Sequence, residues 1–311
     1  MKQGIFRMFT IVALVAALAG GALALHSRRA APTSDAVRVS ATFYPMAEFV
    51  RQVGGRYVQV STLVKPGVEP HDYDPTPQDI AGIYKSKVFV YNGAGLERWT
   101  DRLQGDLSAN HVVSVNASNG IALHAKDASD TENTSSTDPH VWMDPTLAIK
   151  EVSNIRDGLI KADPAHAGAY RANAASYVTQ LQALDQQFKT GLSHCQNHTI
   201  ITSHQAFRYL AAQYGLDAIG IAGLSPDDEP SPQKLAEIAS LARSRGADYI
   251  FFETLASPKL SQTIAHEVGA KTIAFNPLEG LTQSEIGAGK NYLTVQKDNL
   301  QGLETALHCT L

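Results

Sequence analysis

The stretch that decides the fold runs from Asp163 to His194 and reads DPAHAGAYRANAASYVTQLQALDQQFKTGLSH. Asp163 suits the position before a helix and Pro164 suits its first turn, so these residues predict a helix start. About 30 residues of helix would span about 45 Å, the length of a whole domain. The pattern therefore predicts one long helix that links two halves of the chain and restricts their relative motion. Its apolar residues keep helical spacing at Tyr170, Ala174, Tyr177, Leu181, Leu184 and Phe188.

On both sides of this stretch, apolar β-rich runs alternate with helical runs, which is typical of parallel βα units. The predicted fold is therefore α/β, with two βα lobes on parallel sheets joined by one long helix. The expected strands are 37–43, 57–64, 87–92, 111–115, 199–203, 216–222, 248–253 and 271–276. The expected helices besides the long one are 146–161, 205–213, 232–244, 258–268 and 290–307.

The chain has 311 residues, which favours two domains, and 44% of them are hydrophobic, as in a packed globular protein. We expect a signal peptide and flexible start at 1–34, an N-terminal lobe at 35–162, the interdomain helix at 163–194 and a C-terminal lobe at 195–311. Residues 125–137 are polar and acidic and lack apolar periodicity, so they predict a mobile loop. The acidic side chains of this loop either attract cations or are exposed to solvent without a function.

The first residues resemble a secretory signal peptide. Lys2 and Arg7 precede an uncharged apolar run over 8–25 that ends near a small-residue cleavage signal at 22–24. An uncleaved membrane anchor is the alternative, because 18 residues approach the minimum for a membrane span. No cysteine follows the run for lipid attachment, so we expect a soluble protein exported to the periplasm.

Charge and cysteine content narrow the partners and the compartment. The net charge is −4, and residues 1–34 hold four basic and no acidic side chains, so a chain that begins at Asp35 carries −8. This negative balance argues against a nucleic-acid partner. The two cysteines, Cys195 and Cys309, allow one disulfide in an exported protein, with two separate thiols as the alternative.

Three histidines stand in similar surroundings. His140 lies in DPHVWMDP at 138–145, His71 in VEPHDYDPTP at 68–77, and His204 in TSHQAF at 202–207. Each falls where a predicted strand ends or a helix begins, the edge at which α/β folds bind ligands. Separations of 69 and 64 residues exclude a small structural zinc module. Three imidazoles therefore predict a transition-metal site between the lobes. The other eight histidines are interpreted as surface or packing residues.

Several carboxylates near these histidines have two interpretations. Asp72, Asp138 and Asp144 either accept the free N–H of an imidazole or cap a helix or turn. Glu253 ends a predicted strand of the second lobe and is expected to face the cleft, without an assigned role.

Five motifs together resemble one family, the metal-binding solute receptors of zinc and manganese ABC transporters. The motifs are PGVEPHDY at 66–73, NGAGLE at 92–97, DPHVWMDP at 138–145, SHQAF at 203–207 and EPSP at 229–232. The resemblance covers nearly the whole chain after the signal peptide. It implies two lobes joined by a rigid helix, with the metal held in the cleft between them.

The resemblance implies that His71, His140 and His204 are three of the metal ligands. A histidine as third ligand is typical of zinc receptors, and three imidazoles suit zinc better than manganese. The family often has an aspartate ligand where this chain has Asn276, in the sequence NPLEG at 276–280. The fourth ligand is therefore water, Asn276 or the nearby Glu279. The acidic loop also lacks the histidine cluster that many zinc receptors carry.

From these residues we expect a monomeric zinc receptor, not an enzyme, that delivers Zn²⁺ to the permease subunit of an ABC transporter. A manganese or iron receptor is the first alternative, and it gains weight if a carboxylate joins the histidines. A zinc hydrolase with three histidines and a water is an alternative of another class. A surface adhesin is a third, weakened by the missing lipid-attachment cysteine.

Overall fold

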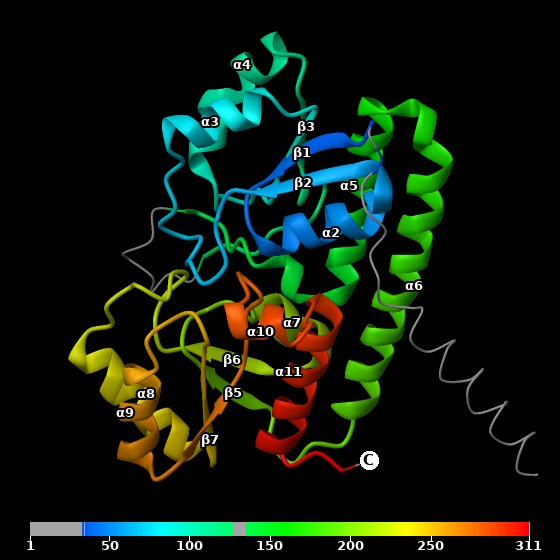
Figure 1. Cartoon of the computed structure of the whole chain (residues 1–311). Helices are drawn as coiled ribbons and strands as arrows, with labels where there is room; N and C mark the ends of the chain where they lie inside the picture. Colours follow the sequence, from blue (N-terminus) through cyan, green and yellow to red (C-terminus); the bar gives the residue numbers. More distant parts are fainter. Residues whose placement is uncertain (1–32, 34, 127–134, 311) are drawn as a thin grey trace, which may run out of the picture.

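The computed structural model describes residues 33, 35–126 and 135–310. The expected signal peptide, apart from Thr33, and the centre of the acidic loop at 127–134 lie outside the described residues. Within them, no helix is long and apolar enough to cross a membrane. Two lobes stand one above the other, and one long helix runs beside both of them (Figure 1).

The N-terminal lobe is built on a parallel sheet with the order β2-β1-β3-β4. Valines are frequent in these strands because β-branched side chains pack well on a pleated surface that is covered on both faces. The strands are β1 (Val37–Ala41), β2 (Val58–Thr62), β3 (Val88–Tyr91) and β4 (Val113–Asn116). The helices are α2 (Tyr44–Gly54), α3 (Pro77–Tyr84), α4 (Gln104–Ala109) and α5 (Pro145–Ala162).

The long helix α6 (Ala167–Gly191) joins the lobes, but it is shorter at both ends than predicted. Residues Pro164–His166 form a 3₁₀ turn before it, so Asp163 and Pro164 stand at a helix start as predicted, although the Asp163 side chain makes no capping hydrogen bond. The Asp163 carboxylate instead accepts hydrogen bonds from His166 Nδ1 at 2.7 Å and from the Tyr170 hydroxyl at 2.6 Å. The carboxylate therefore binds two side chains at the start of the helix. All six apolar residues of the predicted stripe are buried.

The C-terminal lobe repeats the βα pattern in two parallel strand pairs, β5 with β6 and β7 with β8. The strands are β5 (Thr199–Thr202), β6 (Asp217–Gly220), β7 (Tyr249–Phe252) and β8 (Lys271–Ala274). The helices are α7 (Arg208–Tyr214), α8 (Pro232–Ser244), α9 (Lys259–Val268), α10 (Gln283–Gly287) and α11 (Tyr292–Ala306). Helix α7 begins three residues later than predicted, because the backbone after His204 makes a tight turn in which Ala206 N donates to His204 O.

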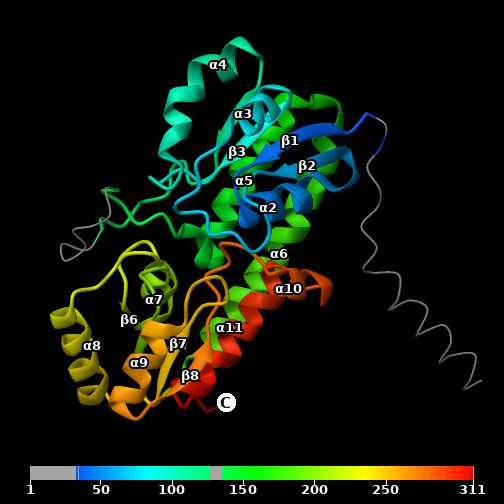
Figure 2. The ribbon, with the colours of Figure 1, turned by 60° about the vertical axis from the view of Figure 1, so that its left-hand side comes forward.

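Several hydrogen bonds hold the lobes together near their junction. Trp142 Nε1 donates to Pro277 O at 2.8 Å, and the Tyr292 hydroxyl donates to Trp142 O at 2.6 Å. Gly67 N donates to Leu281 O at 3.1 Å. Helix α11 lies beside α6 in both views (Figures 1 and 2). The α/β architecture of two lobes and one long helix is confirmed, and so is the disulfide between Cys195 and Cys309.

Candidate metal centre

Two of the predicted ligands come from loops of the N-terminal lobe. His71 follows β2, and its backbone N–H donates to Glu69 Oε1 at 3.0 Å. His140 follows Pro139 and opens a 3₁₀ turn at Val141–Met143. The His140 ring is fully buried, whereas the His71 side chain is 6% exposed. Turns stiffened by neighbouring prolines therefore present both rings toward the second lobe.

The other two side chains of the centre come from the C-terminal lobe. His204 lies just after β5, and Glu279 lies in the loop after β8. This loop turns sharply, because Leu278 takes a positive φ of 61°, and its N–H donates to Asn276 Oδ1 at 2.7 Å. A positive φ is strained for leucine, so the asparagine bond and the complete burial of Leu278 fix the turn that directs Glu279 inward.

The four side chains meet in one cluster, within which one ligand atom of each lies within 4.8 Å of all the others. Nε2 of His140 is 3.2 Å from Nε2 of His71 and 3.2 Å from Nε2 of His204. Glu279 Oε1 is 3.2 Å from Nε2 of His71 and of His140, and 3.1 Å from Nε2 of His204. Zinc bonds of about 2.0 to 2.1 Å give a tetrahedron with edges of about 3.3 Å. Five of the six edges therefore fit a tetrahedral zinc site closely.

Two buried carboxylates orient two of the rings from behind. His140 Nδ1 donates to Asp138 Oδ1 at 2.8 Å, and His204 Nδ1 donates to Glu253 Oε1 at 2.7 Å. Because each Nδ1 carries the shared hydrogen, each Nε2 can offer its lone pair to a metal. Asp138 thus serves the first of its two expected roles, whereas Asp144 caps α5 by accepting from Thr146 N at 2.7 Å.

Burial and close charges shift the pKa values in the cluster in opposite directions. Burial lowers the pKa of His71. Burial also disfavours charge on His140 and His204, but nearby carboxylates outweigh this effect and raise both pKa values. The carboxylates are Asp138 and Glu279 for His140, and Glu253 and Glu279 for His204. Burial opposes charge on Glu279 too, yet the surrounding histidines hold its pKa well below the usual range. The carboxylates therefore favour the protonated form of His140 and His204, whereas burial favours the neutral form of His71.

Asn276 has both ends of its side-chain amide engaged away from the cluster. Its Nδ2 donates to Thr254 Oγ1 at 3.1 Å and to Glu285 Oε1 at 3.0 Å, while its Oδ1 accepts from Leu278 N. Asn276 thus shapes the loop that carries Glu279. Sequence reasoning left Glu253 without a role, and its position at the end of β7 was the only available signal.

The access side of the cluster is polar. A cavity of about 260 Å³ reaches His71 and is lined by residues of both lobes, among them Asp72, Arg98, Asp227 and Asp228. Asp72, whose role was open, is exposed on this side and does not contribute to the four-residue cluster. His71 is the one of the four that lines this cavity, so a cation that enters from it meets His71 first.

The family model described as "Zinc-uptake complex component A periplasmic" (ZnuA) matches residues 39–306. The chain belongs to this family. The high-affinity zinc uptake system protein ZnuA of Bacillus subtilis (strain 168) is 41% identical over 281 residues, which cover 88% of each chain. The zinc-binding lipoprotein AdcA of Streptococcus pneumoniae serotype 4 is 38% identical over 280 residues, which cover 86% of this chain and 55% of AdcA. The chain thus spans about half of AdcA.

A solved structure within the ZnuA family agrees with the fold. The crystal structure of the Zn(II)-bound ZnuA-like domain of Streptococcus pneumoniae AdcA superimposes with a TM-score of 0.77 at 38% identity. The match covers 88% of this chain and 99% of that domain. The resemblance that the five motifs indicated is therefore confirmed at the level of family and fold.

Proposed function

We propose that this protein is a zinc receptor that binds Zn²⁺ between its lobes through His71, His140, His204 and Glu279. The observation that carries the proposal is the near-tetrahedral set of distances among three Nε2 atoms and Glu279 Oε1. Glu279, which comes from a loop fixed by Asn276, is then the fourth ligand, and neither Asn276 nor water is needed. The names of the relatives, which describe zinc uptake and zinc binding, support the same metal.

The donor set separates zinc from the alternatives. Three imidazoles and one carboxylate in a compact tetrahedron suit Zn²⁺, whereas Mn²⁺ prefers more oxygen ligands in an octahedral arrangement. A catalytic zinc site keeps one position open for water, but here four protein atoms would close the coordination shell. We infer that the protein binds and releases the metal without bond chemistry, which agrees with the transport role of the ZnuA family.

We further propose that the protein acts outside the cytoplasm as a monomer and passes Zn²⁺ to the permease subunit of an ABC transporter. The signal-peptide pattern in residues 1–34 supports export, and the family description names a periplasmic component of an uptake complex. The disulfide between Cys195 and Cys309 fits an oxidising compartment. The segments 35–162, 163–194 and 195–311 are our proposed N-terminal lobe, linking helix and C-terminal lobe.

Calorimetric titration of the chelator-stripped protein with Zn²⁺ and separately with Mn²⁺ tests the proposal. We expect one tight zinc site, much weaker manganese binding, and loss of the zinc site in His140→Ala. His308→Ala is the matched control, because His308 also pairs with an aspartate, Asp248, at 2.8 Å but lies exposed and away from the cluster. Tight zinc binding that survives His140→Ala would refute the site, and preferential manganese binding would refute the metal.

A further inference from the structure

Tyr209, in the first turn of α7, joins two segments of the N-terminal lobe with its hydroxyl group. The hydroxyl accepts a hydrogen bond from His124 N at 2.9 Å and donates one to Asp138 O at 2.8 Å. The Tyr209 ring stacks on the His124 ring, with centroids 4.2 Å apart and planes within 12°. Asp138 N also donates to His124 O at 2.9 Å, so the two segments are paired where Tyr209 binds them.

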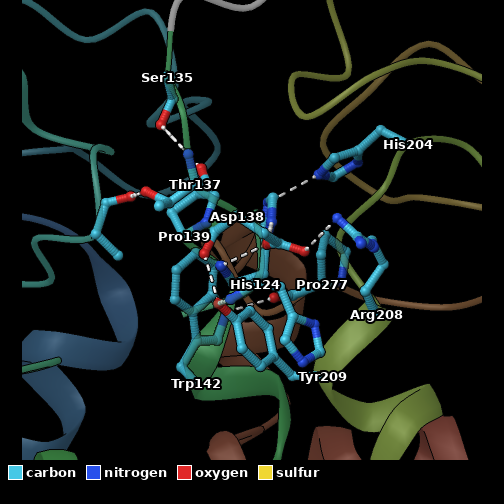
Figure 3. A network of polar contacts seen from close by, with 12 residues as sticks. His124, Ser135, Thr137, Asp138, Pro139, Trp142, His204, Arg208, Tyr209 and Pro277 are labelled. Atoms are coloured by element: carbon cyan, nitrogen blue, oxygen red, sulfur yellow. Dashed lines mark hydrogen bonds and ion pairs between the residues drawn. The ribbon is translucent and has the colours of Figure 1, made fainter. Parts of the chain in front are cut away.

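Arg208, the neighbour of Tyr209, reaches the same two segments with its guanidinium group. Its Nη1 donates to Ala125 O at 2.8 Å and lies 3.9 Å from Asp138 Oδ2. Asp138 is fully buried, and among the described residues no group hydrogen-bonds to its Oδ2. The Arg208 guanidinium therefore places a positive charge 3.9 Å from that oxygen without a hydrogen bond to it. Figure 3 shows Arg208 and Tyr209 converging on Asp138.

The segment that Arg208 and Tyr209 hold carries a proposed metal ligand. Asp138 Oδ1 accepts from both the backbone N–H and the Nδ1–H of His140, at 3.0 and 2.8 Å. One carboxylate oxygen thus fixes the His140 backbone and ring, while the other faces Arg208. Any shift of Asp138 away from α7 must move the His140 ring with it.

Arg208 and Tyr209 also lie close in sequence to the ligand of the opposite lobe. His204 is four residues before Arg208, and the turn that links them leads directly into α7. One short segment of the C-terminal lobe therefore supplies a ligand and grips the carboxylate that orients a ligand of the N-terminal lobe. Separation of the lobes would break these bonds and release the His140 ring at the same time.

We propose that Arg208 and Tyr209 are positioning residues that form an interlobe clamp on Asp138, and that this clamp keeps His140 oriented for as long as the lobes stay closed on zinc. The inference rests on the proposed function and deepens it, because it names the contact that couples lobe separation to metal release. The clamp residues touch no metal ligand directly, so they act on the rate at which zinc leaves and leave the ligand set unchanged.

Two substitutions in the full chain test the clamp. Tyr209→Phe removes both hydroxyl hydrogen bonds and keeps the ring on His124, and Arg208→Gln removes the charge beside Asp138. Tyr170→Phe, which deletes the hydroxyl bond to Asp163, and Arg243→Gln, which deletes the ion pair with Glu267, are matched controls far from the cluster. Arg208→Lys restores the charge and tests rescue.

The zinc dissociation rate is measured by mixing the Zn²⁺-loaded protein with excess chelator. We expect a rise of about tenfold in each clamp variant, the lower end of what partners of metal ligands usually contribute, with association rates within about twofold of wild type. The controls should keep wild-type rates, and Arg208→Lys should recover part of the loss. In the Co²⁺-loaded protein, the clamp variants should change the visible ligand-field spectrum and the controls should not.

Each outcome decides between the two proposals. Wild-type dissociation rates and an unchanged Co²⁺ spectrum in both clamp variants would overturn the clamp while the zinc site stands. Slower association with unchanged dissociation would also overturn it, because the clamp would then act on metal capture. Failure of the wild-type protein to bind Zn²⁺ at one site would overturn the proposed function and the clamp with it.

Discussion

The three histidines of the cluster differ in how firmly the protein holds them. His140 and His204 are fully buried, and each donates Nδ1–H to a buried carboxylate. His71 is partly exposed beside the access cavity, and of its two ring nitrogens only Nε2 has partners among the described residues, namely His140 and Glu279. Burial also lowers the pKa of His71, whereas that of the other two is raised.

This difference indicates that the three histidines have different roles in metal binding. Two rings are oriented before the metal arrives, so little conformational entropy is lost when they bind it. The His71 ring has no such carboxylate partner at Nδ1 among the described residues, and it is positioned by the loop after β2 and by its contacts with His140 and Glu279. We therefore infer that His140 and His204 set the affinity and that His71, which lines the cavity, is the first ligand to meet an entering metal.

The largest expected effect comes from removal of an oriented ligand. His204→Ala should weaken zinc binding by more than about 100-fold. This is more than the loss usually seen when a residue that hydrogen-bonds to a metal ligand is replaced, because the change removes a ligand and also leaves buried Glu253 without its imidazole. His71→Ala should cost at least about tenfold less, because no carboxylate is left unpaired behind it. Competition with a zinc-binding dye measures both. Equal losses of zinc affinity in the two variants, or a larger loss for His71→Ala, would contradict these different roles.

The next effect concerns the carboxylate behind His204. Glu253→Gln keeps the shape of the side chain but weakens the acceptor at His204 Nδ1, and we expect a loss of about 10- to 100-fold in zinc affinity. His204 would then lack a carboxylate partner at Nδ1, as His71 does among the described residues. Glu267→Gln, which affects an exposed ion pair with Arg243, is the control and should leave affinity unchanged. Wild-type affinity in Glu253→Gln would show that the ring needs no partner.

The pH dependence of binding should separate the same histidines. His140 and His204 have raised pKa values, so they keep their protons above the ordinary histidine pKa of about 6.5 and zinc must displace them. Affinity should therefore fall as pH decreases, by up to about tenfold per pH unit for each displaced proton. His71, with its lowered pKa, competes with protons only at lower pH, so His71→Ala should keep this dependence. Zinc titrations across pH with proton release measured calorimetrically check the sign, and a pH-independent affinity would contradict it.

The smallest expected effect on zinc comes from the disulfide. Replacement of both Cys195 and Cys309 by serine removes a link across 114 residues, and we expect the free energy of unfolding to fall by about 2 to 4 kcal/mol. Zinc affinity should stay within about twofold, because the disulfide joins the end of α6 to the C-terminus and is not part of the cluster. Denaturant unfolding and zinc titration together test this. A large loss of affinity would mean that the disulfide positions the ligands.

The sequence predicted the fold better than the details of the site. The apolar stripe of α6 and the β-rich runs lie within single segments, so periodicity reveals them directly. Asp163 stands at the predicted helix start, but its carboxylate binds the side chains of His166 and Tyr170, and periodicity does not reveal such side-chain contacts. Helix α10 escaped prediction because it has only five residues, although Thr282 and Glu285 form a capping box at its start.

The sequence by itself determined that three histidines on stiff turns stand at strand edges, that two βα lobes flank one long helix, and that a single disulfide was available. Only the tertiary structure decided which groups meet these histidines. Glu279 reaches His71 across 208 positions, and Arg208 reaches Asp138 from the other lobe. The physical reason is that hydrophobic periodicity and turn chemistry act within a segment, whereas a metal cluster is set by how separate segments pack. Asn276 illustrates this, because its hydrogen bonds with Thr254, Glu285 and Leu278 make it stabilise the loop that carries Glu279.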